Sequence, residues 1–191
     1  LAQAQTTVDR ALSLDPTLVS AQVTRARLLA VRNELPAALA AANAVIEKSP
    51  GALDAMLLKA EVESIMGRAN DSRATVEAMI KAAPNHIVAR YMLVTLLVRA
   101  QQIDQAANEA EAMRKIAPND PRTTYSTGLV AFARGDYPAA LVAVQSALKV
   151  APNFAPALSL SALVDIQRGS YGAAEQSLRN VLAQVPNDVP A

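Results

Sequence analysis

Apolar residues recur along this chain at the spacing of amphipathic helices. In residues 1–15, Ala4, Val8, Ala11 and Leu12 fall on one helical face, the pattern of a helix with one buried side. From Val19 onward the pattern returns as pairs of helical segments joined by short stretches. The first helix of a pair is predicted to cover about positions 1–14 of a repeated unit, and the second helix about positions 18–31.

A series of prolines gives the length of that unit. Its members are 34 residues apart, with no insertion or deletion: Pro16, Pro50, Pro84, Pro118, Pro152 and Pro186. This period is typical of stacked helix-turn-helix repeats. The chain 1–191 is therefore predicted to be one array, with complete units at 19–52, 53–86, 87–120, 121–154 and 155–188. Residues 1–18 would be the second helix of a partial repeat and 189–191 the start of another, as expected for part of a longer protein.

Two columns of small residues indicate close helix packing. Position 8 holds Ala26, Ala60, Val94, Gly128 and Ala162. Position 20 holds Ala4, Ala38, Ser72, Ala106, Ala140 and Ala174. Because position 20 contains only alanine and serine, we expect Ala140 to lie where the two helices of its unit approach most closely.

Local signals mark the helix ends. Asp120 is predicted to cap a helix that begins at Pro121, where the missing N–H of proline costs nothing. Gly67, Gly135 and Gly169 fall where the first helix of a unit ends, a position that favours positive φ. Arg114 interrupts an aliphatic column at position 28, which indicates a locally looser or water-facing junction after the third unit.

The period, the small-residue columns and the proline resemble the tetratricopeptide repeat family. The family's large residue at position 4 is replaced by Gln22, Met56, Arg90, Thr124 and Leu158. The resemblance implies an all-α fold, a right-handed α-solenoid of stacked antiparallel helix pairs with a groove lined by the first helices. The alanine-rich, insertion-free style also resembles bacterial repeat proteins of exosortase (PEP-CTERM) and exopolysaccharide loci.

Composition narrows the classes of partner. The net charge of +1 does not favour nucleic acid or an anionic membrane. No apolar run reaches the roughly 20 residues of a membrane span, so none is expected in this segment. Cysteine is absent, which excludes disulfides and thiolate metal sites within the chain.

Candidate catalytic chemistry is sparse. The single histidine, His86, is interpreted as a surface residue at a repeat junction. Glu61 and Glu63 are two residues apart, so they point to different sides of a helix. Asp165 and Arg168 are interpreted as a surface ion pair. We therefore predict no enzyme activity, no catalytic residues, no cofactor and no metal.

In the family, positions 2, 5, 9, 12 and 13 of the first helix face the groove. The residues that this implies for partner binding are Tyr91, Thr95, Tyr125, Leu129, Phe132, Leu163 and Ile166. The alternative is that some of them, Phe132 and Ile166 above all, belong to the core between repeats. One binding mode of the family, the clamp for the C-terminal carboxylate of a chaperone, needs lysine at position 5. Here position 5 holds Val23, Leu57, Tyr91, Tyr125 and Ser159, so this mode is rejected.

The sequence favours a non-catalytic scaffold that holds a protein or peptide in this groove. The alternatives are a structural spacer or self-assembly module without a lateral ligand, and an accessory domain of a larger protein. The final helix carries Ala174, Leu178, Val181 and Leu182, which predict an exposed apolar face and end-to-end self-association. A periplasmic or envelope-associated location is suspected from the style of the repeats, with a cytoplasmic one as the alternative.

Overall fold

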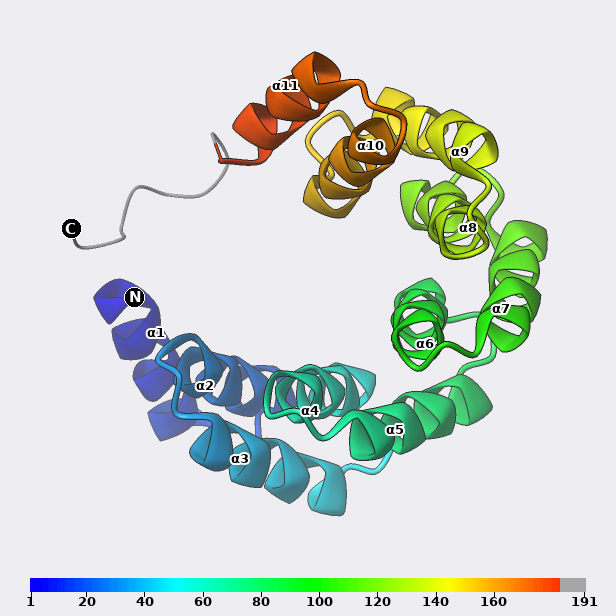
Figure 1. Ribbon diagram of the computed structural model, residues 1–191. Helices are drawn as coiled ribbons and strands as arrows, with labels where there is room; N and C mark the ends of the chain where they lie inside the picture. Colours follow the sequence, from blue (N-terminus) through cyan, green and yellow to red (C-terminus); the bar gives the residue numbers. More distant parts are fainter. Residues whose placement is uncertain (183–191) are drawn as a thin grey trace. The chain divides into compact units, whose positions relative to one another are not determined.

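The computed structural model describes residues 1–182, and this part of the chain consists of α-helices joined by short turns (Figure 1). Helices pack as antiparallel pairs, so the predicted all-α fold of stacked helix pairs is confirmed. The predictions for residues 183–188, the end of the last repeat, and for 189–191 lie outside the described residues.

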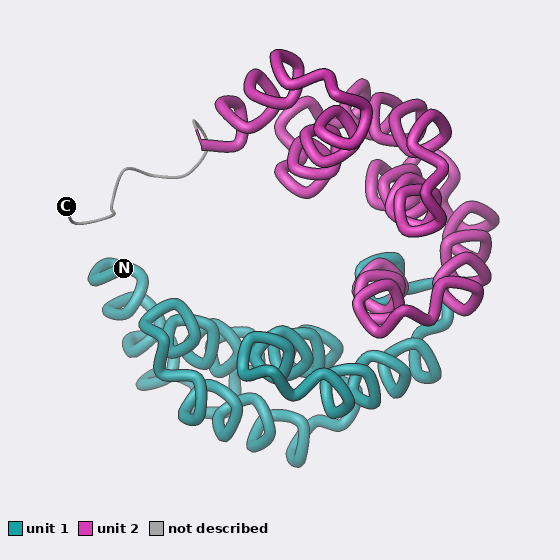
Figure 2. Tube along the Cα trace, viewed as in Figure 1, with its two compact units in different colours: residues 1–89 teal, residues 90–191 magenta. Residues whose placement is uncertain are grey.

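The chain divides into two compact units, residues 1–89 and 90–191, which are coloured separately in Figure 2. The first unit contains α1 (Ala2–Leu14), α2 (Val19–Val31), α3 (Leu35–Lys48), α4 (Leu53–Ile65) and α5 (Ala69–Ala82). The boundary falls in the first turn of α6 (Ile87–Arg99). The second unit continues with α7 (Ile103–Ile116), α8 (Pro121–Ala133), α9 (Tyr137–Val150), α10 (Ala155–Gln167) and α11 (Tyr171–Leu182).

The helix start predicted at Asp120 and Pro121 is present in α8, and α9 begins with a similar cap. The Asp120 carboxylate accepts a hydrogen bond of 2.8 Å from the Arg122 backbone N–H, and Pro121 is the first helical residue, as predicted. Asp136 caps α9 in the same way, accepting from the Ala139 N–H at 3.0 Å. The second helix of each repeat begins about one residue earlier than predicted. In α3 and α9 the residue before Pro36 or Pro138 is already helical.

The turn inside each repeat requires a left-handed residue at position 15. Gly67, Gly135 and Gly169 have φ of 75°, 78° and 73°, as expected from their place in the sequence. The first and third repeats place Asn33 (φ 61°) and Gln101 (φ 59°) at the same position. The tight turn therefore belongs to the repeat geometry, and these two repeats adopt it without glycine.

The core is a series of local clusters, as expected for a repeat array. In the first unit a cluster around Ala26, Ala42 and Leu58 joins α2, α3 and α4. In the second unit a cluster around Tyr125, Val144 and Leu160 joins α8, α9 and α10. Small residues at the helix crossings, such as Ala38 and Ala106, are fully buried, which lets neighbouring backbones approach closely.

Candidate functional site

The residues predicted to bind a partner lie on the first helices of the repeats in the second unit. Tyr91 and Thr95 are on α6, Tyr125, Leu129 and Phe132 are on α8, and Leu163 and Ile166 are on α10. Helices α8 and α10 contact each other, and their second helices α9 and α11 lie on the opposite side (Figure 1). The stacking of first helices therefore brings residues from three repeats onto one surface.

Three aromatic rings join these helices. The ring centroids of Tyr91 and Tyr125 are 5.8 Å apart, and Phe154 lies 6.4 Å from Tyr91 and 5.5 Å from Tyr125. These tilted and edge-on arrangements are the favourable ones for aromatic pairs. Phe154 precedes the first residue of α10 and was not among the predicted site residues. Its position 34 in the repeat lies outside the five groove columns, so only the structure associates it with the tyrosines.

Tyr125 forms the floor of this surface. Its side chain is only 8% exposed, whereas Tyr91 and Leu129 are partly buried. Burial raises the pKa of Tyr125 to about 12, and the neighbouring Tyr91 adds to the rise. Burial also raises the pKa of Tyr91, although Arg122 and Arg99 act in the opposite direction. Both phenols are therefore protonated at neutral pH and available as hydrogen-bond donors.

The most exposed part of the surface is on α10. Leu163 is 48% exposed and Ile166 is 40% exposed, so Ile166 does not belong to the core between repeats. Phe132 is half-buried because its ring packs against Tyr137, with centroids 5.6 Å apart. The Thr95 hydroxyl donates to the Tyr91 backbone carbonyl at 3.1 Å, so this hydrogen bond stays within α6.

The corresponding helix faces of the first unit are different. Val23 is buried, and Arg27 is exposed. Burial raises the pKa of Glu61, while Arg27 acts in the opposite direction. A partly buried carboxylate near a cation makes this face polar. The apolar surface described above is in the second unit.

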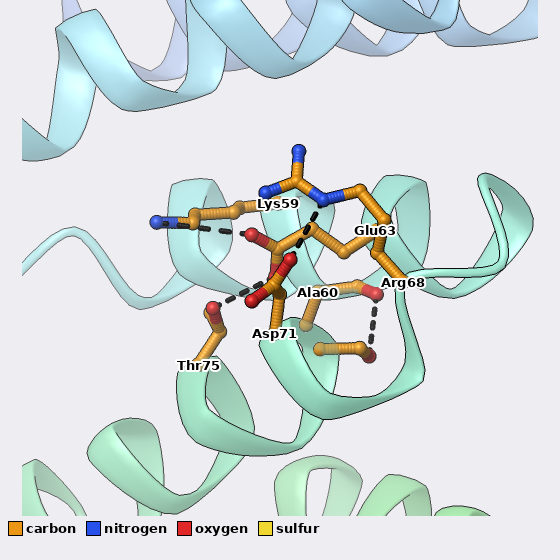
Figure 3. A network of polar contacts seen from close by, with 7 residues as sticks. Lys59, Ala60, Glu63, Arg68, Asp71 and Thr75 are labelled. Carbon is orange, nitrogen blue, oxygen red and sulfur yellow. Dashed lines mark hydrogen bonds and ion pairs between the residues drawn. The ribbon is translucent and has the colours of Figure 1, made fainter.

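The titratable residues considered above have structural roles. Glu63 is buried and accepts a 2.8 Å hydrogen bond from the Thr75 hydroxyl of α5, with the Lys59 ammonium 3.9 Å away (Figure 3). Glu61 is on another side of α4, as expected. His86 is partly buried at the junction between repeats, and its Nδ1 accepts the Ala89 N–H at 3.1 Å, so it caps the start of α6.

Asp165 also differs from its prediction. Its side chain is 7% exposed, and it forms no ion pair with Arg168 in the described structure. It occupies position 11 of its repeat, as Glu63 does, and this column faces neighbouring helices. The predicted surface ion pair is therefore wrong, because i, i+3 spacing alone does not tell which side of the helix is covered.

Arg114 behaves as predicted. It faces solvent and pairs with Glu111 of the same helix at 2.7 Å. Within residues 1–182 the acidic and histidine side chains form no cluster of three or more that could hold a metal ion. In the same residues, none of the helices is both long enough and apolar enough to cross a membrane.

Stacked helix pairs with a partly exposed apolar face define an α-helical repeat protein of the kind that serves as an interaction scaffold. Two family models, both described as tetratricopeptide repeat, match this chain. One matches residues 23–87 and 91–157, and the other matches residues 131–191. Together they extend over most of the sequence, so the chain belongs to the tetratricopeptide repeat family. Comparison with curated protein sequences gives no significant match.

Solved structures share the fold. TTC0263, a thermophilic repeat protein of Thermus thermophilus, has 17% identity and a TM-score of 0.77, over 90% of this chain and 93% of its own. MamA from Desulfovibrio magneticus RS-1 has 17% identity and a TM-score of 0.62, over 86% and 93%. YrrB, described as having an unusual peptide-binding site, has 20% identity and a TM-score of 0.59, over 95% and 93%. At these identities the likeness is one of fold.

Proposed function

We propose that this protein is a non-catalytic scaffold that binds a peptide or amphipathic helix of a partner protein on the apolar surface of α6, α8 and α10. The observation that carries the proposal is the exposure of Leu163 and Ile166 on α10, a helix that packs against α8, where Tyr125 is part of the aromatic cluster. The site comprises Tyr91, Thr95, Tyr125, Leu129, Phe132, Leu163 and Ile166.

The energetics favour an apolar anchor in the partner. Leu163 and Ile166 expose roughly half of their side-chain surface, and covering apolar area stabilises a complex by about 25 cal/mol per Å² before the cost of association. Tyr125 is nearly covered already, so it supports the surface and adds little area of its own. The Tyr91 hydroxyl supplies a polar contact at the edge, a common use of tyrosine at interfaces.

A site-specific crosslink tests this proposal. A photoreactive residue replaces Leu163 in one variant and the exposed Gln145 of α9 in a matched control, and both are incubated with bacterial envelope and soluble fractions. We expect a discrete adduct from position 163 alone, and we expect Leu163→Gln with Ile166→Gln to abolish capture of the same protein by the unmodified scaffold. Equal adducts from both positions would exclude the groove. A substitution of Tyr125 does not test binding in the groove, because Tyr125 is part of the core.

We extend the proposal to a bacterial envelope or exopolysaccharide system, with the scaffold in the periplasm or associated with the envelope. The support is the resemblance in style to repeat proteins of those loci. YrrB, a fold relative described as having a peptide-binding site, supports peptide binding only in general. Fractionation of the native host, with the protein detected by antibody, tests the location, and recovery in the cytoplasm alone would overturn it.

A second function, self-assembly through the exposed face of α11, is favoured by the apolar side chains of this helix. Leu178 is 44% exposed and Leu182 is 70% exposed, whereas Ala174, expected on the same open face, is buried against α10. In interior repeats a second helix is covered by the next first helix, and another copy could supply that cover. Sedimentation of the wild type and of Leu178→Glu with Leu182→Glu tests it. A concentration-dependent oligomer that the double variant abolishes is expected.

A further inference from the structure

The first unit contains a cleft of about 380 Å³ that the proposed function does not use. It lies between α1, α2 and α3, and its lining residues are Leu12, Pro16, Gln22, Arg25, Leu29, Ala41, Ala44, Val45 and Lys48. The three lining residues on α2, Gln22, Arg25 and Leu29, occupy repeat positions 4, 7 and 11. These are not among the positions that face the groove in the family. The cleft is therefore on a different face of the repeat from the groove residues.

The floor of the cleft is aliphatic. Val45 is 3% exposed, and Leu12, Leu29 and Ala41 are partly buried. At one end of the cleft, the side-chain amide of Gln22 donates a hydrogen bond to the Pro16 carbonyl at 2.6 Å. Leu12, Leu29 and Ala41 thus offer a place for an apolar side chain without a competing polar group beneath it.

The charges that line the cleft are both positive. Arg25 and Lys48 are exposed, and in the described part of the chain neither forms an ion pair. Asp15, the acidic residue next to Pro16, is held by the Thr17 N–H and hydroxyl at 2.8 and 2.7 Å. The mouth of the cleft therefore carries two cations that form no ion pair among the described residues.

A second cleft, of about 300 Å³, shows the contrast within one chain. It lies along α7 and α8, and three of its lining residues, Arg114, Thr127 and Ala131, are three repeats on from Leu12, Arg25 and Leu29. There the charges are neutralised internally: Arg114 pairs with Glu111 at 2.7 Å and Arg134 with Asp104 at 3.0 Å. The same place in the repeat thus does not require unpaired cations.

We infer that the cleft between α1, α2 and α3 is a second docking site, for an acidic peptide segment. An aliphatic side chain of the peptide covers Leu12 and Leu29, and its Asp or Glu side chains pair with Arg25 and Lys48. Charge complementarity of this kind selects the partner and accelerates association. A peptide fits better than a lipid because the cleft is open to solvent at its mouth and does not enclose an acyl chain.

A random dodecapeptide phage library selected against chain 1–191 tests this inference. Binding of the enriched peptides is then measured by fluorescence polarisation against the wild type and Arg25→Glu with Lys48→Glu. We expect enriched peptides with Asp or Glu beside aliphatic residues, and a loss of affinity of about tenfold or more in the double variant. The control is Arg32→Glu with Lys81→Glu, the same charge change on exposed residues of the first unit outside the cleft, and it should leave affinity unchanged.

Several results would overturn the inference. They are the absence of any enriched peptide, enriched peptides without acidic residues, and equal binding by the double variant and the wild type. If laurate displaces the bound peptides at a concentration below the one at which the peptides themselves bind, the cleft is a fatty-acid site instead. Peptides whose binding depends only on Leu163 and Ile166 would support the groove and count against this cleft. Circular dichroism of each variant confirms that it is folded.

Discussion

Gly128 of α8 and Ala140 of α9 lie where the two backbones of their repeat approach closely. A Cβ atom placed on Gly128 would be 3.3 Å from the Ala140 carbonyl oxygen and 3.2 Å from the Ala143 Cβ. Ala140 itself is fully buried, as its column predicted. A larger side chain at either position must displace neighbouring atoms, because the added Cβ at Gly128 would meet both side-chain and backbone atoms of α9 and Ala140 has no exposed surface.

Ala140→Leu should therefore destabilise the protein by about 1–3 kcal/mol through overpacking. The neighbouring Ala139 is exposed, so Ala139→Leu is the matched control and should change the free energy of unfolding by less than about 0.5 kcal/mol. Urea unfolding followed by circular dichroism measures both. An unchanged midpoint for Ala140→Leu would contradict the register of α9 on α8.

Substitution of alanine for Gly135 and for Gly172 should change the stability of the protein in opposite directions. Gly135 has φ 78°, so Gly135→Ala should cost about 1 kcal/mol although nothing lies within 4 Å of the added Cβ. Gly172 is in the first turn of α11 with equally open surroundings and no positive φ, so Gly172→Ala should be neutral or stabilise by a few tenths of a kcal/mol. Thermal melts of the two variants give the comparison, and the same sign for both would contradict the left-handed turn.

The hydrogen bond between Thr75 and Glu63 should be important for the packing of α4 on α5. Thr75→Val keeps the shape of the side chain but leaves a buried carboxylate without this donor, so it should cost about 1–3 kcal/mol. Glu63→Gln keeps an acceptor and should cost less. A double-mutant cycle from urea unfolding measures the coupling, and additive effects would show that the bond contributes nothing.

Stability should fall as the pH rises from about 10 to about 12, partly because of Tyr125. The pKa of Tyr125 is raised from 10.0 to about 12 in the folded state, so between these values the folded protein holds a proton that the unfolded chain has lost. The stabilisation is present below pH 10 and is lost through this window. Tyr125→Phe should flatten the dependence, and Tyr171→Phe, at an exposed position, should not. Urea midpoints measured across the window decide between them.

The repeat length, the helix pairs and the small residues at their crossings could be predicted from the sequence, because each depends on spacing along one helix or on a local turn. The proline period located the helices to within about a residue, and the column containing Ala140 identified a buried crossing.

Which side chains are covered was decided by the tertiary structure. Glu63 and Asp165 look like surface residues in the sequence, yet a neighbouring helix buries both. Tyr125 is a floor residue because Phe154, 29 residues later, packs on it. The left-handed turn at Gln101 is likewise imposed by the return of the second helix onto the first, since nothing in its own chemistry favours positive φ. Burial depends on atoms that neighbouring helices bring, and helical periodicity alone does not specify them.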